Sequence, residues 1–265
     1  MKGRVLSVAG SDSGGGAGIQ ADIKTVTALG GYAATAITAL TAQNTLGIDG
    51  ILPVPADFVR RQMAAVLADI GADCVKTGML HDAGIVAAVA DCLAEMAPDV
   101  PLVVDPVTVA TTGALLLDEE AVEILKTRLI ARATVLTPNI PEAEALLGRR
   151  IAAAEMADAA QALQALGPAA IVLKGGHIHG SPVRDLVVEG GTSYVLESPR
   201  VDTRHIHGTG CTLASAIATG IAQGMALRAA IERAHRFVQR AIASAPGYGK
   251  GTGPLDHTHG IGKGK

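Results

Sequence analysis

The segment His207–Leu213 (HGTGCTL) combines residue types that suit the binding of a negatively charged group. Gly208, Thr209 and Gly210 stand immediately before a long helical pattern, and glycines let successive backbone N–H groups converge. The dipole of the following helix adds positive potential at the same point. Cys211 at such a terminus is expected to have a lowered pKa and to act as a base or a polar contact. The segment therefore predicts a site for a transferring phosphoryl group; the alternative is a small buried cysteine at a helix start.

Two further segments place polar side chains at the ends of predicted strands. Lys174 in Lys174–His177 (KGGH) is a cation that suits a nucleotide phosphate, and the alternative is an exposed lysine at a strand end. Asn139 and Glu142 in Thr137–Glu142 (TPNIPE) have the spacing of a helix capping box. The same pair could form an outer shell for Mg²⁺ and its waters. Capping and metal positioning are compatible roles.

The segment Gly10–Gly18 (GSDSGGGAG) follows the first predicted strand and opens a helix. It has no G-x-G-x-x-G register, and the chain has no G-x-x-x-x-G-K-[ST] segment, which excludes a dinucleotide fingerprint and a P-loop. Its glycines allow close approach of the backbone to a small ligand, or form a flexible turn and cap. In the helix that follows, Asp22 falls within the apolar stripe. A carboxylate there must pair with Lys24 or another group, or face a polar ligand.

A parallel sheet is the element that would bring these segments together. Strands that are apolar throughout and separated by helices indicate a parallel sheet covered on both faces, and such sheets bind ligands at the carboxyl ends of their strands. The predicted strands are Arg4–Ala9, Tyr32–Leu40, Cys74–Thr77, Leu102–Asp105, Thr134–Leu136 and Ile171–Lys174, with a hairpin of Val183–Val188 and Tyr194–Glu197. The predicted helices are Gly18–Leu29, Ala56–Ile70, Ala83–Met96, Glu119–Leu129, Ile140–Leu147, Met156–Leu166, Gly210–Gln223 and Ala226–Ala243. Thr41–Val54 is predicted to form a small β flap outside the main sheet.

Composition excludes several classes of function. The 265 residues carry a net charge of −3 and only 2% aromatic residues, which argues against nucleic-acid binding. No run of about 18 apolar residues predicts a membrane span. Three separated cysteines indicate reduced thiols in a cytoplasmic protein, and no linker divides the chain, so a single domain over residues 1–265 is expected. The histidine pairs His177/His179, His205/His207 and His257/His259 lack the ligands that would complete a transition-metal site.

Taken together, the motifs resemble the hydroxymethylpyrimidine and phosphohydroxymethylpyrimidine kinases of thiamin biosynthesis. The similar segments are AGSDSGGGAGIQADIKT, ITALTAQNT, VKTGML, DPV, TPNIPEAEAL, VLKGGH and HGTGCTLASAIA, in order from about Val5 to Ala243. The resemblance implies a ribokinase-like three-layer α/β/α fold with a mostly parallel sheet. It also implies ATP and Mg²⁺ as cofactors, a homodimer, and phosphorylation of a pyrimidine alcohol and then of its monophosphate.

The resemblance also assigns roles to residues. It implies an anion hole at Gly208–Gly210 and Cys211 at the position of the catalytic Asp of sugar-kinase relatives. Lys174 would face the ATP phosphates, and Asn139 and Glu142 would organise Mg²⁺. The implied pyrimidine site comprises Gly10, Ala17, Asp22, Gln43, Met79 and Val107, with Gln43 hydrogen-bonded to the aminopyrimidine. The implied nucleotide site adds Asp105, Thr137, Asn139 and Gly176 to Lys174.

The segment Val107–Leu116 (VTVATTGALL) departs from the family pattern. The family leads us to expect a methionine and then a Lys-Ser-Gly-type stretch, where this chain has Thr108 and Thr111-Thr112-Gly113. The missing lysine bears on the second phosphorylation more than on the first. Two other functions are alternatives to a pyrimidine kinase: a pyridoxal or pyridoxine kinase of the same superfamily, and a non-catalytic pyrimidine-binding sensor.

Overall fold

One mostly parallel sheet organises the computed structural model, which describes residues 1–108, 117–176 and 180–260. The strand order is β3-β2-β1-β4-β5-β6-β7-β8-β9, and β2, β1, β4, β5, β6 and β7 are parallel. Antiparallel pairing adds β3 at one edge and β8 and β9 at the other. The strands are β1 Arg4–Asp12, β2 Tyr32–Asn44, β3 Gly47–Pro53, β4 Cys74–Thr77, β5 Leu102–Val104, β6 Val135–Leu136, β7 Ala170–Leu173, β8 Val183–Glu189 and β9 Thr192–Ser198.

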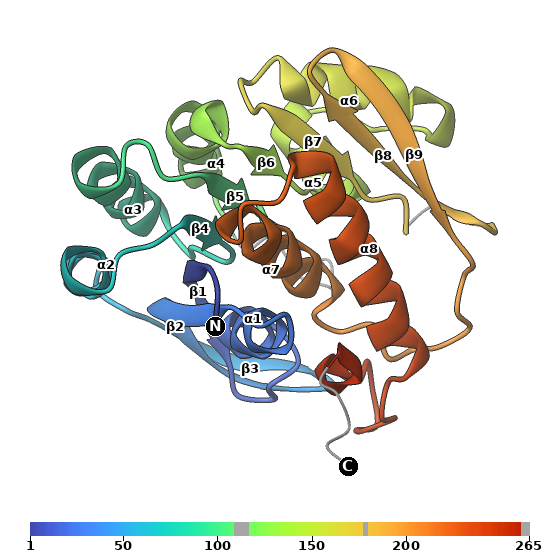
Figure 1. Cartoon of the computed structure of the whole chain (residues 1–265), viewed down its shortest axis with the longest axis horizontal. Coiled ribbons are helices and arrows are strands. Elements are labelled where there is room, and N and C mark those ends of the chain that lie inside the picture. The colour runs from blue at the N-terminus through green and yellow to red at the C-terminus, as the bar shows by residue number, and fades with distance from the viewer. Residues whose placement is uncertain (109–116, 177–179, 261–265) are drawn as a thin grey trace.

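Helices cover both faces of this sheet (Figure 1). The α-helices are α1 Gly18–Ala28, α2 Ala56–Asp69, α3 Ala83–Met96, α4 Glu119–Ile124, α5 Ile140–Leu147, α6 Met156–Gln164, α7 Thr209–Ala222 and α8 Leu227–Ala243. A π-helical turn Leu125–Leu129 and short 3-10 turns at Ile130–Arg132, Ala153–Glu155 and His257–Gly260 complete the helical elements of the described residues. The predicted α/β/α architecture is thus confirmed.

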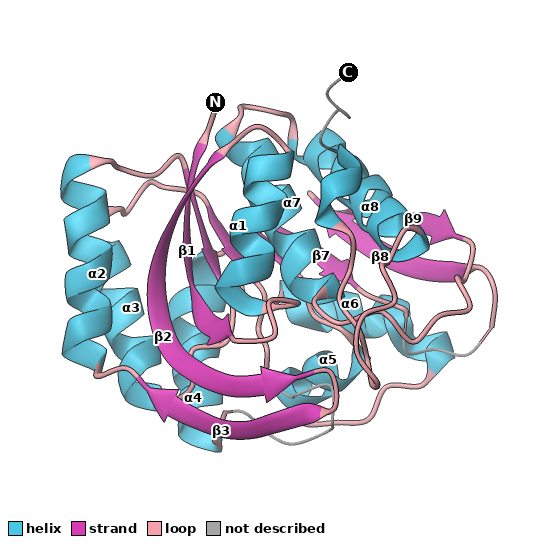
Figure 2. Cartoon of the chain, turned by 90° about the horizontal axis from the view of Figure 1, so that it is seen from below, coloured by secondary structure: helices cyan, strands magenta, loops and turns pink. Residues whose placement is uncertain are grey.

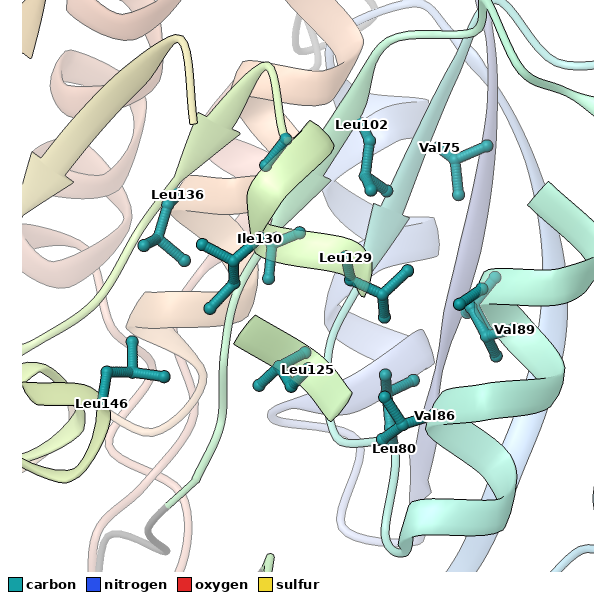
Figure 3. Packing of buried hydrophobic residues seen from close by; sticks show 14 of the residues in the cluster. Val75, Leu80, Val86, Val89, Leu102, Leu125, Leu129, Ile130, Leu136 and Leu146 are labelled. Carbon is teal, nitrogen blue, oxygen red and sulfur yellow. The ribbon is translucent and has the colours of Figure 1, made fainter. Parts of the chain in front are cut away.

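Each face of the sheet has its own apolar core. Side chains from α2 to α6 pack on one face, where Val75, Leu102 and Leu136 of the strands meet Val89 and Leu146 (Figure 3). On the other face the core joins the sheet to α1, α7 and α8, with Val26, Leu213, Ile217, Ile231 and Phe237 as members. The continuous apolar strands therefore reflect burial on both sides, as expected for a parallel sheet.

Several predicted elements have other bounds in the structure, among them β1, which runs on from the predicted end at Ala9 to Asp12. The segment Thr41–Val54 consists of the end of β2 and all of β3, and β3 continues the edge of the main sheet rather than lying outside it (Figure 2). The reason is that β2 runs on past the predicted end at Leu40 to Asn44. The predicted helix Glu119–Leu129 ends its α-helical part at Ile124. Both strands of the predicted hairpin are longer than expected, because pairing extends from Val183↔Ser198 to Glu189↔Thr192.

Within the described residues, every helix is too short or too polar to cross a lipid bilayer.

Candidate active site

The N-terminus of α7 forms the centre of the candidate site. Gly208 precedes the helix with a φ of +85°, and a Cβ at this position would clash with the backbone carbonyl oxygen of Gly16. The first intrahelical bond runs from the N–H of Thr212 to the carbonyl of Gly208 at 2.9 Å. The N–H groups in the turn before it have no intrahelical acceptor and add to the positive end of the helix dipole. The backbone at this helix terminus is therefore compatible with the predicted anion hole, which stays a prediction.

Lys174 lies beside this helix terminus, at the end of β7. Its Nζ is 3.3 Å from Oδ1 of Asp105 and 3.7 Å from Oε2 of Glu142, and its side chain is 13% exposed. A Cβ placed on Gly210 would be 3.2 Å from the same Nζ. The structure thus brings together the predicted phosphate-binding lysine and the predicted anion hole. Thr137 completes the group, since its Oγ1 donates to Oδ1 of Asp105 at 3.3 Å.

Burial shifts the ionisation of the two buried partners in this cluster. Burial, reinforced by Asp105, raises the pKa of Glu142 to about 7, although Lys174 opposes the shift. Burial alone would lower the pKa of Lys174, but Asp105 and Glu142 outweigh it and raise that pKa to about 12. The lysine is therefore a permanent cation at neutral pH.

The predicted capping box is present at the start of α5. Oδ1 of Asn139 accepts a bond from the N–H of Glu142 at 2.9 Å, and Oε2 of Glu142 accepts one from the N–H of Asn139 at 2.8 Å. A backbone bridge joins Asn139 to Lys174. The capping box therefore holds the Glu142 carboxylate at the same strand ends as the lysine.

The prediction of a lowered pKa for Cys211 was wrong. Burial raises the pKa of this thiol to about 12, and Asp22 and Asp105 add to the rise. Lys76 and a backbone hydrogen bond from Gly18 act in the opposite direction but do not outweigh burial. The thiol is therefore protonated at neutral pH in the unliganded protein.

Asp22 lies inside the molecule and has no exposed surface. Its carboxylate pairs with Nζ of Lys76 at 2.9 and 3.0 Å and accepts hydroxyl bonds from Ser7 at 2.5 Å and Ser215 at 2.6 Å. The expected ion pair thus exists, but with Lys76 and not with Lys24. Because Asp22 is fully buried and its carboxylate is bonded to protein groups, it has no surface with which to make the pyrimidine contact that the resemblance implied.

Of the remaining residues of the predicted pyrimidine site, Met79 and Gln43 lie against the Gly-rich segment that contains Gly10 and Ala17. A Cβ placed on Gly10 would lie 3.2 Å from the methyl group of Met79, so the two residues are neighbours. Nε2 of Gln43 is 3.2 Å from Nε2 of His207. Val107 has a positive φ of +34°.

The predicted nucleotide-binding residue Gly176 is exposed, and nothing would crowd a Cβ placed on it. Residues 109–116, with Thr111, Thr112 and Gly113, and residues 177–179, with His177 and His179, lie outside the described residues.

Sequence reasoning missed a second polar pair, Asp12 and His207. Asp12 is buried, and its carboxylate accepts bonds from the N–H groups of Gly14, Gly16 and Ala17 at 2.8–2.9 Å. Nε2 of His207 lies 3.0 Å from its Oδ2. Burial would raise the pKa of Asp12, but His207 and the N–H groups of Ala17 and Gly14 outweigh it and lower that pKa. The signal in the sequence was the aspartate inside the glycine run.

Comparison with known proteins shows the family of this chain. The sequence model of the family described as phosphomethylpyrimidine kinase matches residues 12–256. The chain belongs to this family. Among curated members, the hydroxymethylpyrimidine/phosphomethylpyrimidine kinase of Streptomyces coelicolor is 47% identical over 260 residues, which cover 98% of this chain and 96% of that protein. The thiamine biosynthesis bifunctional protein ThiED of Geobacter sulfurreducens is 52% identical over 257 residues, and the chain spans 52% of its length.

Solved structures place the phosphomethylpyrimidine kinase fold of this chain in the ribokinase-like group. The ADP complex of Bacillus subtilis pyridoxal kinase superposes with a TM-score of 0.91 at 34% identity, covering 97% of this chain and 98% of the other. Phosphomethylpyrimidine kinase from Clostridium difficile gives a TM-score of 0.80 at 38% identity, covering 91% and 100%. The chain is therefore a phosphotransferase with a ribokinase-like fold.

Proposed function

We propose that the chain transfers the γ-phosphoryl group of ATP to hydroxymethylpyrimidine and then to its monophosphate. The observation that supports the proposal most directly is the position of Lys174 against the N-terminus of α7. A Cβ placed on Gly210 would lie only 3.2 Å from the ammonium nitrogen of Lys174. Phosphoryl transfer needs positioning and charge stabilisation rather than covalent chemistry. A fixed cation beside a helix N-terminus supplies both.

The other residues have supporting roles in this proposal. Backbone N–H groups at Gly210 and Cys211 would receive the transferring phosphoryl group, and Lys174 would neutralise its charge. Cys211 stands in the turn where the pyrimidine alcohol would approach. Because its thiol is protonated in the free protein, the thiol can act as a base only if bound ligands lower its pKa. Gln43, Gly10, Ala17, Met79 and Val107 would contact the pyrimidine ring.

Magnesium fits the chemistry of the residues present. Asp105, Asn139 and Glu142 offer carboxylate and amide oxygens, which are the ligands that Mg²⁺ prefers. Among the described residues no three His, Cys, Asp or Glu side chains converge closely enough to bind a metal directly, so binding through water is the arrangement proposed. The bound cation would neutralise phosphate oxygens. Thr137 and Lys174 would hold Asp105 and Glu142 in place.

Two features support further expectations about the whole protein. The hairpin of β2 and β3, called the flap hairpin below, exposes apolar side chains. Leu40 is 44%, Ile51 37% and Leu52 64% exposed, which supports a homodimer. The three cysteines are free thiols, which supports a cytoplasmic location. Sedimentation velocity of the purified protein tests the dimer.

ADP release with Mg-ATP is the experiment that tests the proposal, with hydroxymethylpyrimidine, its monophosphate and pyridoxal offered separately. Turnover of both pyrimidines, abolished by EDTA and restored by Mg²⁺, is the expected result. Turnover of the alcohol alone would indicate that the sequence of Val107–Leu116, which departs from the family pattern, prevents phosphorylation of the monophosphate. Preference for pyridoxal would assign the chain to the activity of the Bacillus subtilis neighbour, and nucleotide binding without turnover would indicate a sensor.

A further inference from the structure

The C-terminal segment Gly247–His257 follows α8 along the chain (Figure 1), and it contacts the candidate site. Sequence motifs gave it no role, although it contains four glycines, and a fifth, Gly260, follows it. It is well anchored: Leu255 is 4% exposed, and the N–H of Asp256 donates to the carbonyl of Ala241 in α8 at 3.1 Å. Immediately after it, the ring of His259 lies 4.4 Å from that of Phe237. The segment is therefore a fixed part of the fold.

This segment holds the tip of the flap hairpin. The tip is the turn between β2 and β3 that contains Thr45. The N–H of Gly251 donates to Oγ1 of Thr45 at 3.2 Å, and the N–H of Thr252 donates to the carbonyl of Thr45 at 2.9 Å. A Cβ on Gly251 would clash with that carbonyl. The close approach therefore requires glycine, and it fixes the strand end that carries Gln43.

The same segment holds the loop that leads into the anion hole. The N–H of His207 donates to the carbonyl of Gly253 at 3.1 Å, and His207 and Pro254 form a backbone bridge. Pro254 also faces the Gly-rich loop, because its Cβ lies 3.3 Å from a Cβ placed on Gly16. The segment Gly247–His257 thus contacts three parts of the candidate site: the turn at Thr45, the loop at His207 and the Gly-rich segment at Gly16.

His257 reaches the first turn of α7 itself. Its Nε2 lies 2.9 Å from Oγ1 of Thr212, the residue after Cys211. Both side chains are buried, with 4% and 0% exposed. The contact fixes the turn whose N–H groups form the anion hole.

We propose that the segment Gly247–His257 is a positioning element of the active site, with two separable parts. Gly251 and Thr252 hold the flap through Thr45 and so set the affinity for the pyrimidine. His257 holds the start of α7 through Thr212 and so sets the rate of phosphoryl transfer. The assignment of these two effects rests on the proposed kinase function.

The flap part is tested with Gly251→Ala and a matched control, Gly50→Ala. Both glycines have ordinary backbone angles, but a Cβ on Gly50 meets only the Cβ of Ala42, at 4.0 Å. Gly251→Ala is expected to raise KM for hydroxymethylpyrimidine about tenfold while kcat changes much less, because a displaced flap misplaces Gln43. Hydrogen exchange in peptides covering residues 40–53 should accelerate in this variant. Gly50→Ala should match the wild type in both measurements.

The helix part is tested with His257→Leu and the conservative variant His257→Gln. The leucine variant is expected to lower kcat about tenfold with little change in KM, since the anion hole is used in the transition state. Glutamine keeps a polar atom within reach of Thr212 and should restore most of kcat. Thermal denaturation of both variants, together with hydrogen exchange over residues 206–213, separates a local effect from loss of the fold.

The outcomes distinguish this proposal from the proposed function. If the wild-type protein turns over no pyrimidine, the proposed function fails, and the exchange measurements still report whether the segment holds the flap and α7. If the wild type is active but Gly251→Ala behaves like Gly50→Ala, the flap part is overturned. Faster exchange without a higher KM would also overturn it, because the contact would then be structural only. Wild-type kcat in His257→Leu, or equal losses in the leucine and glutamine variants, would overturn the helix part.

Discussion

Nζ of Lys76 lies 2.9 Å from Oδ1 of Asp22, and neither side chain has any exposed surface. The pair joins β4 to α1, and the hydroxyl of Ser215 connects it to α7, one turn after Cys211. A buried ion pair is costly to dehydrate, so its carboxylate needs the additional hydrogen bonds that Ser7 and Ser215 provide. This network therefore connects α1 and β4 to α7, one turn after the proposed anion hole.

Removing the ammonium of this pair should destabilise the protein strongly. Lys76→Met leaves the Asp22 carboxylate buried without its cation, and a loss of about 3–5 kcal/mol in the free energy of unfolding is expected. The double variant Lys76→Met/Asp22→Leu should lose less than Lys76→Met alone. Urea denaturation measures both.

Lys126→Met is the surface control for that experiment. Lys126 pairs with Glu123, whose side chain is 63% exposed, and the variant should change stability by about 0–1 kcal/mol. Equal losses in the two lysine variants would contradict the role of the buried pair.

Cys211→Ala should retain pyrimidine binding and lose most turnover. The thiol stands at the helix terminus where the alcohol and the phosphoryl group would meet, and a proton-transfer role accounts for about 100-fold or more in rate. Calorimetric titration with the pyrimidine and ADP release under saturating Mg-ATP separate the two effects. Unchanged turnover would remove Cys211 from the mechanism.

The Cys211 thiol should react slowly with iodoacetamide at pH 7.5 in the unliganded protein. Its pKa is raised to about 12, so the reactive thiolate is scarce, and the rate should still be rising with pH above 9. Mass spectrometry of the labelled peptides distinguishes Cys211 from Cys74 and Cys92. A rate that reaches a plateau below pH 8 would contradict the raised pKa.

Gln43→Ala should weaken pyrimidine binding more than ATP binding. Gln43 lies on β2 near the flap tip, within 3.2 Å of His207, whereas Lys174 and Asp105 lie at the ends of β7 and β5. Separate KM values for the two substrates provide the measurement. Equal increases in both would be incompatible with a pyrimidine contact.

Stability should fall as the pH drops from about 6.5 to about 4. Burial lowers the pKa of His257 to about 4, with Lys24 and His259 acting in the same direction and Asp256 against them. In this window the unfolded chain binds a proton that the folded protein does not, which removes up to about 3 kcal/mol by pH 4. His257→Gln should flatten this part of the curve, measured by urea denaturation at a series of pH values. An unchanged slope would show that another group is responsible.

Local patterns were sufficient for the fold, and they identified residues that the structure brings together in the candidate site, where their roles stay predictions. The apolar strands predicted the parallel sheet, and Gly208–Gly210 and Lys174 were predicted from their places at element ends. Lys76 was missed because it occurs within the short strand Cys74–Thr77, where only tertiary packing brings it to Asp22. The pKa of Cys211 was predicted in the wrong direction for a similar reason: burial and the carboxylates of Asp22 and Asp105 outweigh Lys76 and the hydrogen bond from Gly18.

The contact between the Gly16 carbonyl and Gly208 has a consequence for biosynthesis. It joins the first loop of the chain to a helix that is made about 190 residues later, and His257 must follow before that helix is fixed. Domains generally fold as units during synthesis, and distant contacts form late. The helix terminus at Gly208 is synthesised only after all the strands of the described sheet have been made. The proposed anion hole and its contact with His257 are therefore complete only after residue 257 has been synthesised.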